Sequence, residues 1–215
     1  MIWNRLHYEI LNLKNPEEIP SDKWNAAYSF WKAQWNQFIQ EHQLEETLFS
    51  DDFTRSDSAG VLYLDNKIAS IILYKERDLT RESSKDDSYF KVWPKELIEQ
   101  LTRDRVTKVM SAGYLTVHPL LRGEKFQPSL KNIMVELVGR HLGETSAHAM
   151  ICVTNNLKGV NGSTERCGWT LAASGLQHFN HPVNLYVLTR ENAKVSPEIE
   201  NLYPSSKQKR NLKTA

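Results

Sequence analysis

Residues 109–141 read VMSAGYLTVHPLLRGEKFQPSLKNIMVELVGRH, and this stretch decides the fold. Residues 109–117 form an apolar run with the length and β-branched content of a buried strand. Pro119 ends the pairing of that strand, because proline has no N–H to donate to a neighbour. Pro128 marks the start of a helix, where a missing N–H costs nothing since the first turn leaves its N–H groups unbonded. The stretch therefore predicts a strand, a short turn and a helix.

The turn and the start of the helix together favour the binding of an anion. In the predicted helix six residues recur at the helical spacing of 3.6 and form one face that is expected to be buried: Leu130, Ile133, Met134, Leu137, Val138 and His141. Backbone N–H groups at the helix N-terminus point outward, the helix dipole adds partial positive charge, and Arg122 in the turn adds a full charge. An ordinary strand, turn and helix with a solvated basic turn is the alternative explanation of the same residues.

The segment LTVHPLLRG, residues 115–123, followed by a helix resembles the central motif of the GNAT superfamily of N-acyltransferases. In that family the fourth strand exposes backbone amides to the pantetheine arm of acyl-CoA, and an Arg/Gln-x-x-Gly-x-Gly/Ala loop wraps the pyrophosphate. The matching positions are Leu115, Val117, Pro119, Arg122 and Gly123, whereas the two later glycine positions hold Lys125 and Gln127. The resemblance implies an α/β (α+β) fold, in which helices flank a mixed, mostly antiparallel sheet whose fourth and fifth strands splay apart.

Composition and charge favour a cytoplasmic protein without a nucleic-acid or membrane partner. The chain has 215 residues, 40% of them hydrophobic, and a formal net charge of +1, so no field of one sign points to nucleic acid or lipid. Cys152 and Cys167 lack metal-ligand spacing and are interpreted as reduced thiols. No apolar stretch reaches the roughly 20 residues of a membrane helix, and the N-terminus lacks a signal peptide's apolar core. We expect one GNAT-like domain over residues 1–195 and a partly disordered basic tail over residues 196–215.

The elements on either side of the motif follow the order of the GNAT fold. Apolar and polar residues alternate over residues 6–10, as expected of a half-buried first strand. The aromatic stripe of residues 24–39 predicts a helix packed on the sheet, although such a stripe also suits an acyl-chain or base-stacking surface. The other predicted elements are a hairpin over residues 60–74, a short helix over 94–103, the fifth strand over 147–153, a weak helix over 157–167, the start of the sixth strand at 168–169 and the last strand over 183–188. Residues 50–58 are interpreted as a loop or a frayed turn. The charged residues 77–88 are interpreted as a mobile loop in a long segment beside the acceptor pocket.

The resemblance places the donor thioester on the fourth strand and the turn that follows it. It implies that backbone groups of Leu115, Thr116 and Val117 bind the thioester and that Asn155 contacts the pantetheine arm. The phosphate end of acetyl-CoA, or of a longer acyl-CoA, is expected to lie against Arg122, Gly123, Glu124 and Lys125. No metal is implied.

The missing glycines leave a second kind of donor open. A pyrophosphate needs a glycine-rich backbone cradle, whereas an acyl carrier protein presents a single phosphate within an acidic surface. That surface could meet Arg122, Lys125, Lys131 and Arg140 by charge complementarity. The chain is similar in this respect to N-acyl amino acid synthases and acyl-homoserine-lactone synthases, which are GNAT-like folds that accept carrier-protein donors and have an enlarged N-terminal helical part. Acyl-CoA is the first expectation and the acyl carrier protein the second.

The side chain that takes a proton from the acceptor amine is not evident in the sequence. GNAT enzymes often place a carboxylate on the fourth strand and a tyrosine before the sixth, and the matching positions hold Ser111 and Thr164. Attack by an already neutral amine, a water relay or an unfamiliar base remain open. The candidates for that base are His118, His178, His181, Glu76 and Asp78, each of which also fits a solvated surface position. The HxxH spacing of His178 and His181 supplies two ligands, too few for a convincing metal site.

The sequence thus predicts an N-acyltransferase that moves an acyl group from acyl-CoA to the amine of a small molecule or peptide. One alternative is an acyl-carrier-protein-dependent enzyme similar to N-acyl amino acid synthases. Another is a catalytically inactive GNAT-fold protein that binds an acyl thioester or a protein partner, and the residues at positions 111 and 164 favour it. A DNA-binding module is the most distant interpretation, because the charge balance offers no basic face.

Overall fold

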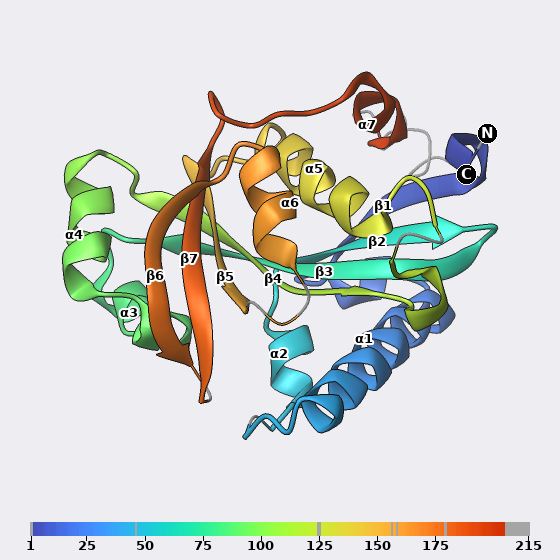
Figure 1. The fold of residues 1–215 in the computed structure, drawn as a ribbon, viewed down its shortest axis with the longest axis horizontal. Helices are drawn as coiled ribbons and strands as arrows, with labels where there is room; N and C mark the ends of the chain where they lie inside the picture. Colours follow the sequence, from blue (N-terminus) through green and yellow to red (C-terminus); the bar gives the residue numbers. More distant parts are fainter. Residues whose placement is uncertain are drawn as a thin grey trace.

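A seven-stranded sheet in the order β1-β2-β3-β4-β5-β7-β6 forms the centre of the molecule (Figure 1). The structure is a computed structural model that describes residues 2–45, 47–123, 126–155, 157, 159–178 and 180–204. Neighbouring strands are antiparallel except β4 and β5, which are parallel. The predicted α/β class with a mixed, mostly antiparallel sheet is therefore confirmed.

The strands are β1 (Leu6–Asn12), β2 (Ser58–Leu64), β3 (Lys67–Asp78), β4 (Lys108–Val117), β5 (Ala149–Asn155), β6 (Thr170–His178) and β7 (His181–Thr189). The α-helices are α1 (Ser21–Glu41), α2 (Ser50–Thr54), α3 (Glu82–Lys85), α4 (Lys95–Arg103), α5 (Leu130–Leu142), α6 (Val160–Arg166) and α7 (Pro197–Leu202). Short 3-10 helices are η1 (Ile2–Arg5), η2 (Pro16–Glu18), η3 (Ser88–Val92) and η4 (Pro119–Leu121).

One face of the sheet is covered by α5, with α6 and α7 beside it (Figure 1). Nine residues of α5 are buried, so this helix is apolar around most of its surface and forms the centre of the largest hydrophobic cluster. Ile133, Met134 and Leu137 pack there against Tyr74 of β3 and Met110 of β4. The predicted burial of this helix face is confirmed.

The opposite face carries two separate hydrophobic clusters instead of one. Under α1, Trp31 packs with Ile71 of β3. Around η3 and α4, Phe90 and Trp93 pack with Val109 of β4. The candidate site lies between these two clusters.

The charged segment predicted as a mobile loop, residues 77–88, is partly regular structure, and that prediction was wrong. β3 continues to Asp78, α3 follows, and η3 begins at Ser88. Arg77 is buried because Asp87 pairs with its guanidinium and the Tyr89 ring covers it at 4.4 Å. Charge in the sequence therefore did not exclude burial, since the counter-ion lies within the same segment.

Several element boundaries also differ from the predicted ones. Residues 50–58 contain α2, which forms because Phe53 is fully buried under α1. The helix after the turn begins at Leu130, with Ser129 as its N-cap, and follows a cis peptide bond between Gln127 and Pro128. The weak helix begins at Val160, and β6 and β7 form a hairpin.

The end of the described chain packs on the sheet rather than extending away from it. α7 lies beyond residue 195 and places Ile199 and Tyr203 in the α5 cluster. Residues 205–215, the greater part of the predicted tail, lie outside the described residues. The domain boundary at residue 195 stays a prediction.

Candidate active site

β4 and β5 separate partway along their length, as the splay prediction requires. They pair from Val109–Ala149 to Ser111–Ile151, after which β4 continues beside β3 and β5 continues beside β7. Within the described residues, β5 offers β4 no partner beyond Ser111. Beyond Ser111, backbone groups on the two inner edges therefore take side chains, water or a ligand as partners, because buried N–H and C=O groups are rarely left unbonded. Ser111 lies at the point where the fork opens.

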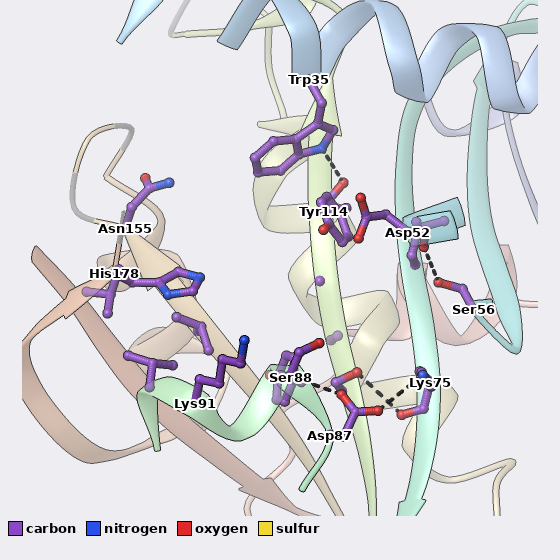
Figure 2. A pocket seen from close by; sticks show the side chains of 18 of the residues that line it. Trp35, Asp52, Ser56, Lys75, Asp87, Ser88, Lys91, Tyr114, Asn155 and His178 are labelled. Atoms are coloured by element: carbon purple, nitrogen blue, oxygen red, sulfur yellow. Dashed lines mark hydrogen bonds and ion pairs between the residues drawn. The ribbon is translucent and has the colours of Figure 1, made fainter. Parts of the chain in front are cut away.

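A β-bulge bends β4 just beyond this fork. Leu73 pairs with Gly113 and Ile71 with Thr116, so Ile72 faces two residues of β4. Tyr114 occupies the bulge with a φ of +57°, and its carbonyl accepts a 2.9 Å hydrogen bond from the indole N–H of Trp35 (Figure 2). α1 thereby holds the bend of β4 in place.

The bulge reverses the faces on which the following side chains of β4 lie. Before it, Ser111 and Gly113 line the cleft described below, and after it Leu115 and Val117 pack toward the α5 cluster. One extra residue in a strand has this effect because side chains alternate with a period of two. The bulge was not predicted from the sequence.

A cleft of about 1090 Å³ opens on the sheet face opposite α5, beside the fork. Its walls come from β3, β4, the end of β5, the adjoining ends of β6 and β7, η3, α2 and the segment before α2. Figure 2 shows β4 running along the cleft, with Trp35 of α1 at one end and Lys91 of η3 toward the other. The cleft therefore occupies the space between the two hydrophobic clusters of this face.

A buried arginine organises the floor of the cleft. The side chain of Arg77 is 6% exposed and donates from Nη1 to the Ser111 hydroxyl at 2.7 Å. Its Nη2 lies 3.2 Å from the Asp87 carboxylate, which also pairs with Lys75. Tyr89 covers the guanidinium and donates from its hydroxyl to the carbonyl of Ile151, the last β5 residue paired with β4. This network joins β3, η3 and both arms of the fork.

Asp87 keeps its negative charge in this setting. Burial acts to raise the pKa of its carboxyl, but the hydrogen bond from the Tyr89 N–H and the charges of Arg77 and Lys75 outweigh it and lower the pKa to about 2. The carboxylate is thus a permanent counter-ion near neutral pH rather than a proton acceptor. We do not expect it to act as the general base.

The two positions where GNAT enzymes often hold acid–base side chains differ in their surroundings. Ser111 is 6% exposed, accepts from Arg77 and donates to the carbonyl of Lys75 at 3.4 Å. Thr164 is 2% exposed within α6, where its hydroxyl donates to the carbonyl of Val160. Both hydroxyls have structural partners, so neither is placed as an unassisted base.

Two of the five predicted base candidates lie in the cleft. His178 at the end of β6 and His181 at the start of β7 face each other across the hairpin and line the same wall. The His178 imidazole points into the opening (Figure 2). Burial lowers the pKa of His178 below its ordinary value, which favours the neutral imidazole that a base requires.

The other three candidates have different surroundings. Glu76 is exposed and follows Lys75 on β3, so its side chain points to the face away from the cleft. Asp78 accepts from Thr80, and these hydrogen bonds lower the pKa of its carboxyl. His118 accepts from the Leu120 N–H in η4. None of these three described residues lines the cleft.

The predicted thioester-binding residues lie on β4 beyond the fork. The carbonyl of Thr116 accepts from the Ser70 hydroxyl at 2.6 Å, and that of Val117 accepts from Arg122 Nε at 2.7 Å. Leu115 packs at the edge of the α5 cluster. Asn155, at the end of β5, lines the cleft. Asn155 and these β4 residues therefore lie on the two separate arms of the fork.

The predicted phosphate-binding turn is described only in part. Arg122 is half-buried, and besides Val117 it contacts the Gln34 side chain on α1 at 3.4 Å. Gly123 has a φ of +81°, a conformation that favours glycine. Glu124 and Lys125 lie outside the described residues. The roles of Arg122, Gly123, Glu124 and Lys125 stay predictions.

The lining residues that were not predicted from the sequence come mainly from the stretch between the second half of β3 and η3, and two of them, Arg77 and Asp87, belong to the segment interpreted as a mobile loop. The full set is Lys75, Arg77, Asp87, Tyr89 and Lys91, all of which line the cleft. The adjacent aromatic pair Tyr89-Phe90 was the available signal, because two large rings after a charged run favour packing over solvation.

The described residues contain no group of three or more His, Cys, Asp or Glu side chains placed to hold a metal ion. In the same part of the chain, none of the helices combines the length and apolar character needed to cross a membrane.

The chain matched no family model and no curated protein sequence. It is similar in structure to FeeM, an N-acyl amino acid synthase from uncultured soil microbes, with a TM-score of 0.61 and 13% identity over 88% of this chain and 94% of that one. It is also similar to the AHL synthase LasI, with a TM-score of 0.58 and 12% identity over 91% and 95% of the two chains. An acyl-CoA N-acyltransferase from Pseudomonas aeruginosa gives a TM-score of 0.55 and 8% identity over 86% and 99%. At these identities the likeness shows the fold, which is that of the GNAT N-acyltransferases.

Proposed function

We propose that the protein is a GNAT-like N-acyltransferase, which moves an acyl group from acyl-CoA to the amine of a small molecule or peptide. The observation that carries this proposal is the fork between β4 and β5, which opens at Ser111 directly beside a cleft of about 1090 Å³. Such a fork offers backbone N–H groups to the thioester, and the cleft offers space for the acceptor. The structures that this chain resembles are N-acyltransferases, which supports the same class of reaction.

In this reaction the amine nitrogen forms a bond to the thioester carbon, the C–S bond breaks, and the thiol leaves with the proton that the amine loses. Backbone N–H groups of β4 near Leu115, Thr116 and Val117 would stabilise the negative charge that develops on the carbonyl oxygen. His178 is the best-placed base for the amine proton, because it faces the cleft and burial lowers its pKa.

The alternative donor is an acyl carrier protein, with an enzyme similar to N-acyl amino acid synthases. Lys125 and Gln127 in place of the two glycines support it, and so does the structural likeness to FeeM and LasI. Arg140 is a weak part of the predicted docking surface, because Glu144 and Glu200 already pair with its guanidinium. A cytoplasmic location suits either donor.

A thiol-release assay decides between these proposals and the catalytically inactive alternative. Acetyl-CoA, a long-chain acyl-CoA and an acyl carrier protein thioester are each incubated with a panel of amines, and the acylated product is identified by mass. We expect one donor class to release free thiol, and to do so only when an amine is present. Calorimetric binding of a thioester with no thiol release for any amine supports the inactive alternative. No binding and no release of any donor overturns the acyl-thioester proposal.

A further inference from the structure

Two side chains that line the cleft bond to the last residue pair that joins β4 to β5. This last rung of the ladder consists of Ser111 on β4 and Ile151 on β5. The Ser111 hydroxyl accepts from Arg77 Nη1 at 2.7 Å, and the Ile151 carbonyl accepts from the Tyr89 hydroxyl at 3.3 Å. Within a sheet the neighbouring strand bonds a backbone carbonyl, and a side chain can take its place where that strand departs. Both members of the rung therefore have a side-chain partner at the point where the strands part.

The two donors are also joined to each other. The Tyr89 ring lies over the Arg77 guanidinium at 4.4 Å. The Asp87 carboxylate lies 3.2 Å from Arg77 Nη2 and accepts from the Tyr89 N–H at 2.9 Å. Together with the two bonds to the rung, these contacts close a ring that begins and ends at paired residues of β4 and β5. Such a ring limits how far one arm of the fork can move relative to the other.

The surrounding structure holds this ring in place. Phe90 and Trp93, which follow Tyr89 in the chain, are both 4% exposed and pack in the hydrophobic cluster that contains Ile151. Burial raises the pKa of the Tyr89 hydroxyl above its ordinary value, so the hydroxyl keeps its proton and remains a donor near neutral pH. Asp87 remains ionised in the same range. The donors and acceptors of the ring therefore keep their roles under ordinary conditions.

We propose that Arg77 and Tyr89 form a clamp that ends the β4–β5 ladder at its last rung and thereby sets the aperture of the fork, which is the separation of the two strands beyond that rung. The inference rests on the proposed function, because it makes both residues positioning residues for that reaction. Arg77 fixes the β4 arm and Tyr89 fixes the β5 arm. The β4 N–H groups beyond the rung are thereby held where the thioester oxygen develops negative charge, and small displacements of such donors are costly in rate.

The first test is made on the protein without ligands. Tyr89→Phe removes the hydroxyl and keeps the ring over Arg77, so it breaks the closed set of contacts at one bond. Tyr186→Phe is the matched control, because this β7 tyrosine also donates one hydroxyl hydrogen bond, to Glu165 at 2.7 Å, and lies outside the cleft lining. Hydrogen exchange is measured by NMR at the amides within two residues of the rung and at the amides of β2, which report global stability.

We expect exchange beside the rung to become at least tenfold faster in Tyr89→Phe relative to the β2 amides, and to stay unchanged by this measure in Tyr186→Phe. A clamp that fixes the arms suppresses local opening there, and its loss releases that opening. Unchanged exchange beside the rung in Tyr89→Phe, or an equal change in the control, overturns the clamp.

The second test uses the thiol-release assay. Tyr89→Phe should lower kcat about tenfold while the acceptor KM stays within twofold, since the hydroxyl bonds to Ile151 and the ring surface is kept. Ser111→Ala breaks the ring at its other end, so the double variant should lose about tenfold in kcat rather than a hundredfold, because one break already releases the clamp. A raised acceptor KM at unchanged kcat would make Tyr89 a binding contact, and a hundredfold loss would make the two bonds independent. Either result overturns the clamp.

The two tests separate this inference from the proposed function. Faster exchange beside the rung in Tyr89→Phe, with no thiol release by wild type from any donor, supports the clamp and overturns the transferase proposal. Thiol release by wild type, with exchange and kcat unchanged in Tyr89→Phe, supports the transferase and overturns the clamp. Unchanged exchange together with no thiol release overturns both.

Discussion

The indole N–H of Trp35 donates a 2.9 Å hydrogen bond to the carbonyl oxygen of Tyr114, the residue at which β4 bulges with a φ of +57°. A left-handed conformation at a non-glycine residue is unfavourable by roughly 1–2 kcal/mol, so the surrounding structure must hold it. Trp31 and Trp35 also pack edge-on against the Tyr114 ring, at centroid distances of 5.7 and 5.1 Å. α1 is therefore coupled to the geometry of the fork, although it lies far from β4 in the sequence.

Replacing Trp35 with Phe tests this coupling, since the change removes the N–H and keeps an aromatic ring. We expect the free energy of unfolding to fall by about 1 kcal/mol, the usual contribution of one such hydrogen bond. We expect kcat/KM in the thiol-release assay to fall by more than tenfold, because the bulge positions the β4 backbone. Denaturant titration measures the first quantity and steady-state kinetics the second.

Trp24→Phe is the matched control, because Trp24 lies on the same helix and packs edge-on against Phe53 rather than on β4. An equal loss of activity in both variants at equal stability would show that α1 acts through the general core and not through Tyr114.

Gly113 offers a way to fill the cleft without disturbing the fold. A Cβ atom built at this position meets nothing within 4 Å, and the residue lines the cleft next to the fork. Gly113→Val should leave thermal stability unchanged or slightly raised, because valine favours strands and glycine does not. We expect thiol release to fall at least tenfold through a raised KM, measured at several acceptor concentrations.

Gly162→Ala in α6 is the control, because that glycine also has open space around its Cβ position and lies outside the cleft lining. Unchanged activity in Gly113→Val would mean that the reacting groups lie elsewhere.

The strand, turn and helix of residues 109–141 could be predicted because local patterns determine them. An apolar run bounded by Pro119, followed by helical spacing, has few other structural solutions. The splay of β4 from β5 was reached through the resemblance of residues 115–123 to the GNAT motif. No spacing in the sequence indicates that two paired strands will part.

The bulge and the charged floor of the cleft depend on contacts that local patterns do not contain. Tyr114 is held by Trp35, 79 residues earlier, and either residue alone fits a regular strand or helix. Arg77 is buried only because Asp87 and Tyr89 fold back on it, and each of these residues is common on protein surfaces. Such features depend on which residues come into contact in the folded chain, and local sequence patterns do not predict those contacts.

Asp87 should make the free energy of unfolding depend on pH in a range below that in which most carboxyl groups titrate. Its pKa of about 2 lies below the ordinary aspartate value of about 3.9, so the folded state favours the ionised form. The stability it contributes is fully present above the unfolded-state pKa and is lost as pH falls through the folded-state pKa. Asp87→Asn should flatten the unfolding free energy between about pH 4 and pH 2 relative to wild type, as acid titrations of unfolding would show.

The same variant leaves Arg77 buried without its counter-ion. We expect a loss of about 2 kcal/mol at neutral pH, less than for a fully buried pair because Asp87 is partly exposed to screening by solvent. Asp86→Asn, at the adjacent C-cap of α3, is the control. If both variants lose stability equally, the pair with Arg77 is not the cause.

His178 should set the acid limb of the pH–activity profile. Burial lowers the pKa of its imidazole below the ordinary value of about 6.5, so the neutral, proton-accepting form predominates at neutral pH. As pH falls through this lowered pKa the imidazole takes up a proton and can no longer accept one from the amine, so kcat/KM should decrease with a midpoint below about pH 6.5.

His178→Asn should remove this limb and lower kcat/KM by about 100-fold, the lower end of the usual contribution of a general base. His118→Asn keeps a side-chain acceptor for the Leu120 N–H and lies outside the cleft lining, so it should keep the wild-type profile. If the acid limb is unchanged in His178→Asn, it does not come from protonation of this imidazole. Proton removal would then be assigned to solvent or to an amine that enters already neutral.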